Sequence, residues 1–152
     1  MLLLALHAGA DTSNDVAQLD ELFPKSTMQI ATPDARLHNF NIWVADNEWR
    51  RARGLMFVKE MPANNGMLFI YPQPFRASMW MKNTFISLDM LFVAADGKVM
   101  QVVANTTPQS LKTIESTDEV VAVIELNAGT AQRLRIAKGA RVMHAAFQPR
   151  SK

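Results

Sequence analysis

Short segments in which apolar and polar side chains alternate run through most of this chain, and such alternation predicts β-strands. Strands are expected at residues 26–32, 36–45, 67–71, 76–82, 90–94, 99–104, 120–126 and 141–147. Turn residues separate several of them, and the Asp96-Gly97 pair suits a tight hairpin. No regular strand–helix–strand rhythm is present, so the pattern favours an antiparallel β-sandwich or barrel over a parallel sheet.

Two short helices interrupt the strand pattern. The first is expected to begin at Asp46, as N-cap, and to end before Gly54, because glycine accepts the left-handed conformation common after a helix. The second is expected over residues 128–135, with Asn127 as its N-cap. The sequence therefore predicts a mainly β domain with two short helices.

The first ten residues, MLLLALHAGA, form an apolar run that ends in small residues and is followed by a polar, acidic stretch. This order is typical of the end of a secretory signal, although a basic first region is missing. We expect residues 1–25 to be a signal-peptide remnant and polar leader, and residues 26–150 to be a single β-sandwich domain. The protein is accordingly expected to be periplasmic or otherwise exported, and no later segment approaches the ~18 apolar residues of a membrane span.

Composition narrows the function classes. The chain has 152 residues and no cysteine, which excludes a disulfide scaffold, a cysteine zinc site and a thiol nucleophile. Its net charge of +2 is spread unevenly, since residues 1–35 carry −4 and residues 36–152 carry +6. The basic residues are scattered along the sequence, so nucleic acid is not an expected partner.

Several spaced motifs make the chain similar to a known family. They are RARGLM (51–56), GMLF (66–69), WMKNT (80–84), LDMLFV (88–93) and IELNAG (124–129). In this order they resemble the family called domain of unknown function 192, a prokaryotic group commonly with exported members, over residues 28–147. Two positions depart from the family pattern: Met79 stands where Phe is frequent, and Val58-Lys59 where Arg is frequent. The resemblance implies a mainly β, jelly-roll-like sandwich and no assigned activity.

A polar cluster follows the apolar strand that contains Trp80. Lys82 breaks the apolar pattern there, and the carboxylates of Asp89 and Glu125 are its candidate partners. One interpretation is a structural ion pair or polar network that fixes the turn at 83–89, because a buried acid should be paired. The other is a ligand site with an aromatic platform. Its candidate residues are Trp80, Lys82, Asn83, Thr84, Asp89 and Glu125.

The leading function hypothesis is a non-catalytic binding module for a small polar ligand such as a sugar, because a flat aromatic ring lies beside hydrogen-bonding groups. One alternative is a glycosidase-like hydrolase that uses Asp89 and Glu125 as an acid/base pair. Another is a protein-interaction domain, which would expose a large apolar patch. An enzyme is the less favoured interpretation, since two acids are common in a β-rich protein and no Gly-x-Ser-x-Gly motif is present.

No metal or other cofactor is expected. The three histidines, at 7, 38 and 144, lack the spacing of zinc ligands. The methionines of the motif region could bind Cu(I), a soft ion, but their apolar neighbours indicate packing instead. The oligomeric state is not indicated by the sequence.

Overall fold

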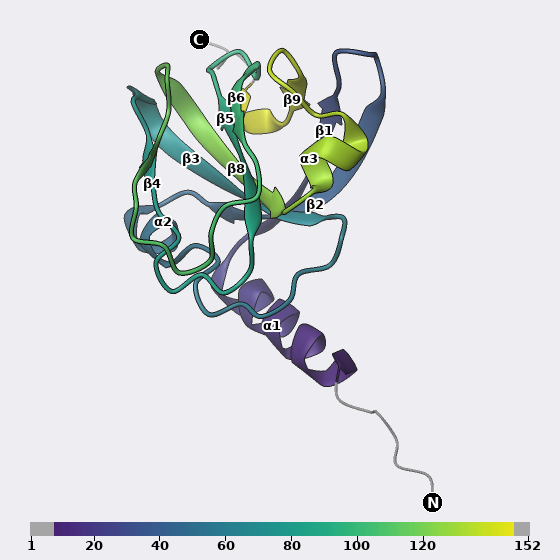
Figure 1. The fold of residues 1–152 in the computed structure, drawn as a ribbon, viewed down its shortest axis with the longest axis vertical. Coiled ribbons are helices and arrows are strands. Elements are labelled where there is room, and N and C mark those ends of the chain that lie inside the picture. Colours follow the sequence, from purple (N-terminus) through teal and green to yellow (C-terminus); the bar gives the residue numbers. More distant parts are fainter. Residues whose placement is uncertain (1–7, 148–152) are drawn as a thin grey trace, which may run out of the picture.

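Seven strands form one mixed sheet that curls into a half-barrel in the computed structural model of this protein (Figure 1). The backbone of residues 8–147 and the side chains of residues 13–147 are described. The sheet strands are β1 (Lys25–Ala31), β2 (Leu37–Ala45), β3 (Asn65–Phe75), β5 (Leu88–Val93), β6 (Val99–Val103), β8 (Val120–Asn127) and β9 (Arg141–Met143). A separate two-stranded sheet consists of β4 (Ser78–Met79) and β7 (Ile114–Glu115). The mainly β class with few helices is confirmed.

The strand order is β6-β5-β8-β3-β2-β1-β9, and the two ends of this order approach each other. An isolated bridge joins Lys98 to Arg141, and the backbone N–H of Val99 donates to the carbonyl of Ala140 at 2.8 Å. The sheet therefore bends far enough for its first and last strands to meet.

One pairing corrects the expected topology. β2 and β3 run parallel, with Ile42 opposite Gly66, so the sheet is mixed and not purely antiparallel. Parallel neighbours need a crossover of a dozen or more residues, and the segment 46–64, which contains α2 (Glu48–Arg53), supplies it. The jelly-roll arrangement is not confirmed.

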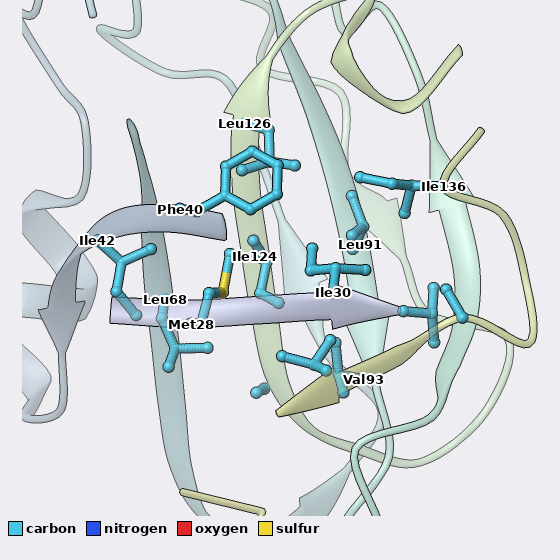
Figure 2. Close-up of a cluster of buried hydrophobic side chains, with 14 of the residues drawn as sticks. Met28, Ile30, Phe40, Ile42, Leu68, Leu91, Val93, Ile124, Leu126 and Ile136 are labelled. Carbon is cyan, nitrogen blue, oxygen red and sulfur yellow. The ribbon is translucent and has the colours of Figure 1, made fainter. Parts of the chain in front are cut away.

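The curled sheet encloses a first hydrophobic cluster, part of which Figure 2 shows. Side chains from opposite strands meet there, among them Met28 and Ile30 from β1 and Leu91 and Ile124 from β5 and β8. α3 (Thr130–Leu134) and the segment after it add Ala131 and other apolar residues to the same cluster.

A second hydrophobic cluster lies on the other face of the sheet. It contains Trp43, Met67 and Met90 from the strands, and Leu19 and Phe23 from the N-terminal segment. Alternation along each strand explains this division, since successive side chains point to opposite faces.

The N-terminal leader is helical where it is described. α1 (Ala8–Leu22) places Leu19 in the second cluster, and Phe23, the residue after the helix, joins it there. The indole N–H of Trp43 donates to the carboxylate of Asp20 at 2.8 Å, which fixes the helix to the sheet. The expected polar leader therefore forms a helix that is fixed to the sheet, while residues 1–7 of the expected signal segment lie outside the described residues. Among the described residues, no helix has the length and apolar character needed to cross a membrane.

Three local expectations change in detail. Asn47, not Asp46, caps α2, because its side chain accepts the N–H of Arg50 at 2.9 Å. The expected strand 76–82 shortens to β4. The last expected strand stops at Met143, and the 3-10 helix η1 (Ala145–Phe147) follows.

Because Leu19 is 1% exposed, Leu19→Ala should lower the free energy of unfolding by ~2–5 kcal/mol. Urea denaturation measures this change, and Asn14→Ala on the exposed face of the same helix is the control, with an expected effect within ~0.5 kcal/mol. Equal effects of the two variants would show that α1 does not pack in solution as described.

Candidate functional site

A pocket of about 190 Å³ opens between the end of α2 and the strands β3, β4 and β8. Its walls combine three cations, aromatic rings, two thioethers and one carboxyl group. The lining residues are Arg51, Ala52, Arg53, Gly54, Leu55, Met56, Phe69, Tyr71, Ser78, Met79, Trp80, Lys82, Thr84 and Glu125.

The turn after α2 forms one wall of the pocket. Gly54 ends the helix with φ of +46°, in the region that glycine adopts most readily. A Cβ atom at this position would lie 3.2 Å from Cζ of Phe69, so the turn also needs glycine for its close approach to β3. The expected position of Gly54 after the helix is confirmed, and it keeps Arg51 and Arg53 at the pocket.

Glu125 forms the buried end of the pocket. It lies on β8 between Met67 of β3 and Met90 of β5, and strand alternation directs it to the face of the second cluster. The residue is 4% exposed. No side chain or backbone group among the described residues makes a hydrogen bond or ion pair with its carboxyl group. Burial raises the pKa of Glu125 to about 8, so the group is mostly protonated at neutral pH.

Tyr71 stands beside this acid. Its hydroxyl donates to Sδ of Met79 at 3.5 Å, a weak bond, and the guanidinium carbon of Arg51 lies 5.3 Å from its ring centroid. Burial, and after it the charge of Glu125, raise the pKa of Tyr71 to about 12, with Arg51 acting in the opposite direction. The phenol therefore keeps its proton at neutral pH and remains a hydrogen-bond donor.

The three cations of the pocket are held by neutral groups. Arg51 donates to the carbonyl of Ile70 at 2.8 Å, and Arg53 donates to the carbonyl of Met56. The ammonium of Lys82 lies 5.0 Å from the ring centroid of Trp80, a cation–π distance. None of the three forms an ion pair with a carboxylate among the described residues, so their charges are available to a ligand.

The structure brings four of the six predicted site residues to the pocket and leaves two outside it. Trp80, Lys82, Thr84 and Glu125 line it, and the Thr84 hydroxyl donates to the carbonyl of Lys82 at 3.2 Å. Asn83 does not line the pocket. Its φ is +53°, and its side-chain amide points to Sδ of Met56 at 3.9 Å. The loop containing Asn83 instead holds the turn after α2, because its carbonyl accepts the N–H of Phe57 at 2.8 Å.

Asp89 is not part of the pocket, which corrects the predicted site. It is opposite Leu126 in the sheet and fully buried on the face of the first cluster. Its two carboxylate oxygens accept the backbone N–H groups of Asn105 and Ala131, both at 2.9 Å. Asp89 therefore fixes the start of α3, whereas the sequence predicted that Asn127 would cap this helix.

Two further hypotheses change with the position of Asp89. The structural ion pair is not observed, since Lys82 pairs with neither Asp89 nor Glu125 among the described contacts. The structural polar network is observed in part, because Asp89 accepts the backbone N–H groups of Asn105 and Ala131. The hydrolase hypothesis loses its second carboxylate, because Asp89 and Glu125 lie on opposite faces of the sheet. The geometry therefore argues against a glycosidase-like acid/base pair.

Comparison with known proteins places the chain in a family. The sequence model of the family described as "Uncharacterized ACR, COG1430", domain of unknown function 192 (DUF192), matches residues 29–144. The chain belongs to the DUF192 family. No curated protein matches the sequence.

Two solved structures resemble this DUF192 protein. One, a proposed transcription regulator from Sinorhizobium meliloti 1021, is 37% identical, with a TM-score of 0.80 over 82% of this chain and 96% of the other. The second, a protein of unknown function from Novosphingobium aromaticivorans DSM 12444, is 29% identical, with a TM-score of 0.77 over 94% of each chain. These relatives support the fold and leave the reaction or ligand open.

The motifs by which this chain resembles DUF192 surround the pocket. RARGLM supplies the turn after α2, WMKNT supplies Trp80 and Lys82, and IELNAG supplies Glu125. Arg51, Arg53 and Tyr71 were not among the predicted site residues. The sequence did indicate the two arginines as candidates, because both come just before the Gly-Leu-Met turn. Nothing in the local sequence indicated Tyr71.

The pocket offers no established metal site. Among the described residues, no group of three or more His, Cys, Asp or Glu side chains could hold a metal ion. Of the methionines considered for Cu(I), Met67, Met81 and Met90 are in the hydrophobic core.

Glu125 should make the stability of the protein depend on pH. The folded state keeps this proton up to a pKa of about 8, while an ordinary glutamate loses it near 4.5. The unfolded chain therefore binds fewer protons between these values, and stability falls as pH rises from 4.5 to 8. The fall should be on the order of a few kcal/mol and absent in Glu125→Gln.

Urea denaturation at a series of pH values measures this effect. Glu119→Gln, at an exposed position, is the matched control and should keep the wild-type profile. A Glu125→Gln profile parallel to the wild type would contradict the assignment.

Proposed function

We propose that this protein is a non-catalytic binding module whose ligand is a small polar molecule held in the pocket beside Glu125. The observation that carries the proposal is a carboxyl group that lines the pocket, is 4% exposed and has no hydrogen-bond partner among the described residues. None of the described side-chain N or O atoms that are fully buried lacks a hydrogen bond, so the unpaired oxygens of Glu125 are those that the pocket leaves accessible. A ligand that reaches the carboxyl group from the pocket would supply the missing partner.

The free-energy cost supports this reasoning. Removing most of a carboxyl group from water costs free energy, even where its oxygens still reach the pocket. An apolar side chain of similar size would fit between Met67 and Met90, which are both completely buried. A costly acid at an otherwise apolar position is therefore better explained by binding than by packing.

The rim of the pocket is suited to hold a small molecule. Trp80 is 47% exposed and offers a flat apolar surface, and the ammonium of Lys82 lies beside the ring. Ligand sites commonly combine such an apolar surface with a few polar groups that fix orientation. Since Glu125 is the only carboxylate among the described lining residues, binding explains the pocket better than two-carboxylate catalysis does.

Glu125→Met tests the proposal, because it fills the same space without a polar group. The variant should raise the free energy of unfolding at pH 8 by ~1–3 kcal/mol. It should also abolish the thermal shift produced by any ligand of the pocket. The measurement is a thermal-shift screen of sugars, organic acids and nucleotides on both proteins.

Lys82→Ala should weaken the same shift, and Lys138→Ala, at an exposed position away from the pocket, is its matched control. A ligand whose shift survives Glu125→Met and Lys82→Ala binds elsewhere and contradicts the proposal. No shift with any compound would instead favour a protein-interaction domain. The exposed edge-to-face ring pair of Phe57 and Phe85, with centroids 5.9 Å apart, is the feature that such a partner would cover.

We also propose that the protein is exported, on the basis of the apolar run at residues 1–10. A reporter enzyme that is active only outside the cytoplasm, fused after residue 152, should be active. Loss of that activity on replacing the apolar run by polar residues is expected. An inactive fusion that is produced at a normal level would contradict export.

A further inference from the structure

The pocket is lined by more positively charged groups than acidic ones. Arg51, Arg53 and Lys82 are cations, whereas Glu125 is the single acid among the described lining residues. The two arginines donate to backbone carbonyls, which neutralise no charge. A ligand in this pocket therefore meets uncompensated positive charge on one side.

The opposite side of the pocket offers an acid in its uncharged form. Glu125 faces charged or titratable side chains from two other elements and one loop: Tyr71 on β3, Arg51 and Arg53 at the end of α2, and Lys82 after β4. None of them forms a hydrogen bond or ion pair with it. Burial is the cause of its raised pKa, and its neighbours in the sheet are apolar. A protonated carboxyl donates one O–H, so the buried end of the pocket presents a donor.

We propose that the ligand is a small hydroxy- or oxo-carboxylate, whose carboxylate binds the cations of the pocket and whose second oxygen accepts the O–H of Glu125. The inference rests on the proposed function and narrows it to one ligand class. Carboxylates suit arginine and lysine, because charge-assisted hydrogen bonds are the stronger ones. The second oxygen supplies the partner that Glu125 lacks within the described part of the protein.

Two other small-ligand classes fit less well. A neutral sugar would leave the positive charges of Arg51, Arg53 and Lys82 unpaired, and desolvated unpaired charge is costly. An amino acid could ionise Glu125 with its ammonium group, but that group would also face the three cations. Like charges at a binding surface cost free energy, so the geometry favours an oxygen over a nitrogen cation beside Glu125.

The size of the pocket agrees with a short molecule. Its volume is about 190 Å³, and a cavity of roughly 150 Å³ accommodates benzene. A compound of lactate size fits within this space.

Isothermal titration calorimetry with lactate, lactamide and alanine tests the ligand class, because the three probes share one shape and differ in charge. Lactate should bind at least tenfold more tightly than the other two. Its affinity should fall about fivefold between pH 8 and pH 9, since binding needs the protonated form of Glu125, whose pKa is about 8. Glu125→Gln keeps a donor and should bind lactate with no such fall.

Variants of the rim complete the experiment. Lys82→Ala should lower the lactate affinity about tenfold through the loss of one charge-assisted contact, while Lys138→Ala should leave it unchanged. If Glu125→Gln unfolds, the Lys82→Ala result and the pH profile of the wild type still test the inference.

The failures of the two proposals are distinguishable. Tighter binding of alanine than of lactate, lost in Glu125→Gln, would overturn the ligand class and leave the binding module intact. Binding of a neutral sugar with no response to lactate would do the same. If no compound from any class binds at the pocket, the proposed function itself fails and the ligand class fails with it.

Discussion

Alternation along β8 is the constraint on which the pocket depends. Ile124 and Leu126 point into the curled sheet, and Val123 and Glu125 point to the outer cluster. Pairing with β3 on one side and β5 on the other buries the strand completely over these positions. Glu125 therefore has no freedom to reach solvent by a change of register, because a shift by one residue would move every apolar side chain to the wrong face. The acid must be accommodated where β8 places it.

The elements around Glu125 close it in without pairing it. The indole of Trp43 and the carboxylate of Asp20 fix α1 against the outer cluster, and α2 ends at Gly54 beside Phe69. The cations of the α2 end and of the loop after β4 line the same pocket as the buried carboxyl of Glu125 and the half-buried phenol of Tyr71. Positive charge combined with protonated donors is an arrangement that discriminates ligands by charge as well as by shape.

Much of the strand content was predictable from the sequence, because alternation and β-branched side chains mark β2 and β8 clearly. The order and direction of neighbouring strands were not predictable, since the parallel pairing of β2 with β3 depends on how segment 46–64 crosses the sheet. The spacing of Val16, Leu19 and Leu22 on one helical face indicated α1, but the acidic composition of the segment obscured this pattern. Asp89 was misplaced because β5 is buried on both faces, so its sequence does not show which way the carboxylate points. The resemblance to the DUF192 motifs located the pocket region, and only the folded structure showed that Glu125 has no partner among the described residues.

Burial keeps Glu125 protonated at neutral pH, and the proposed ligand contact depends on this proton. A carbon-13 NMR titration of the side-chain carboxyl groups measures this directly, with the Glu125 signal assigned by its absence in Glu125→Gln. We expect a midpoint near the pKa of about 8 that burial gives this group. A midpoint near the ordinary glutamate value of 4.5 would show that Glu125 is ionised at neutral pH, and would contradict its role as a donor in the pocket.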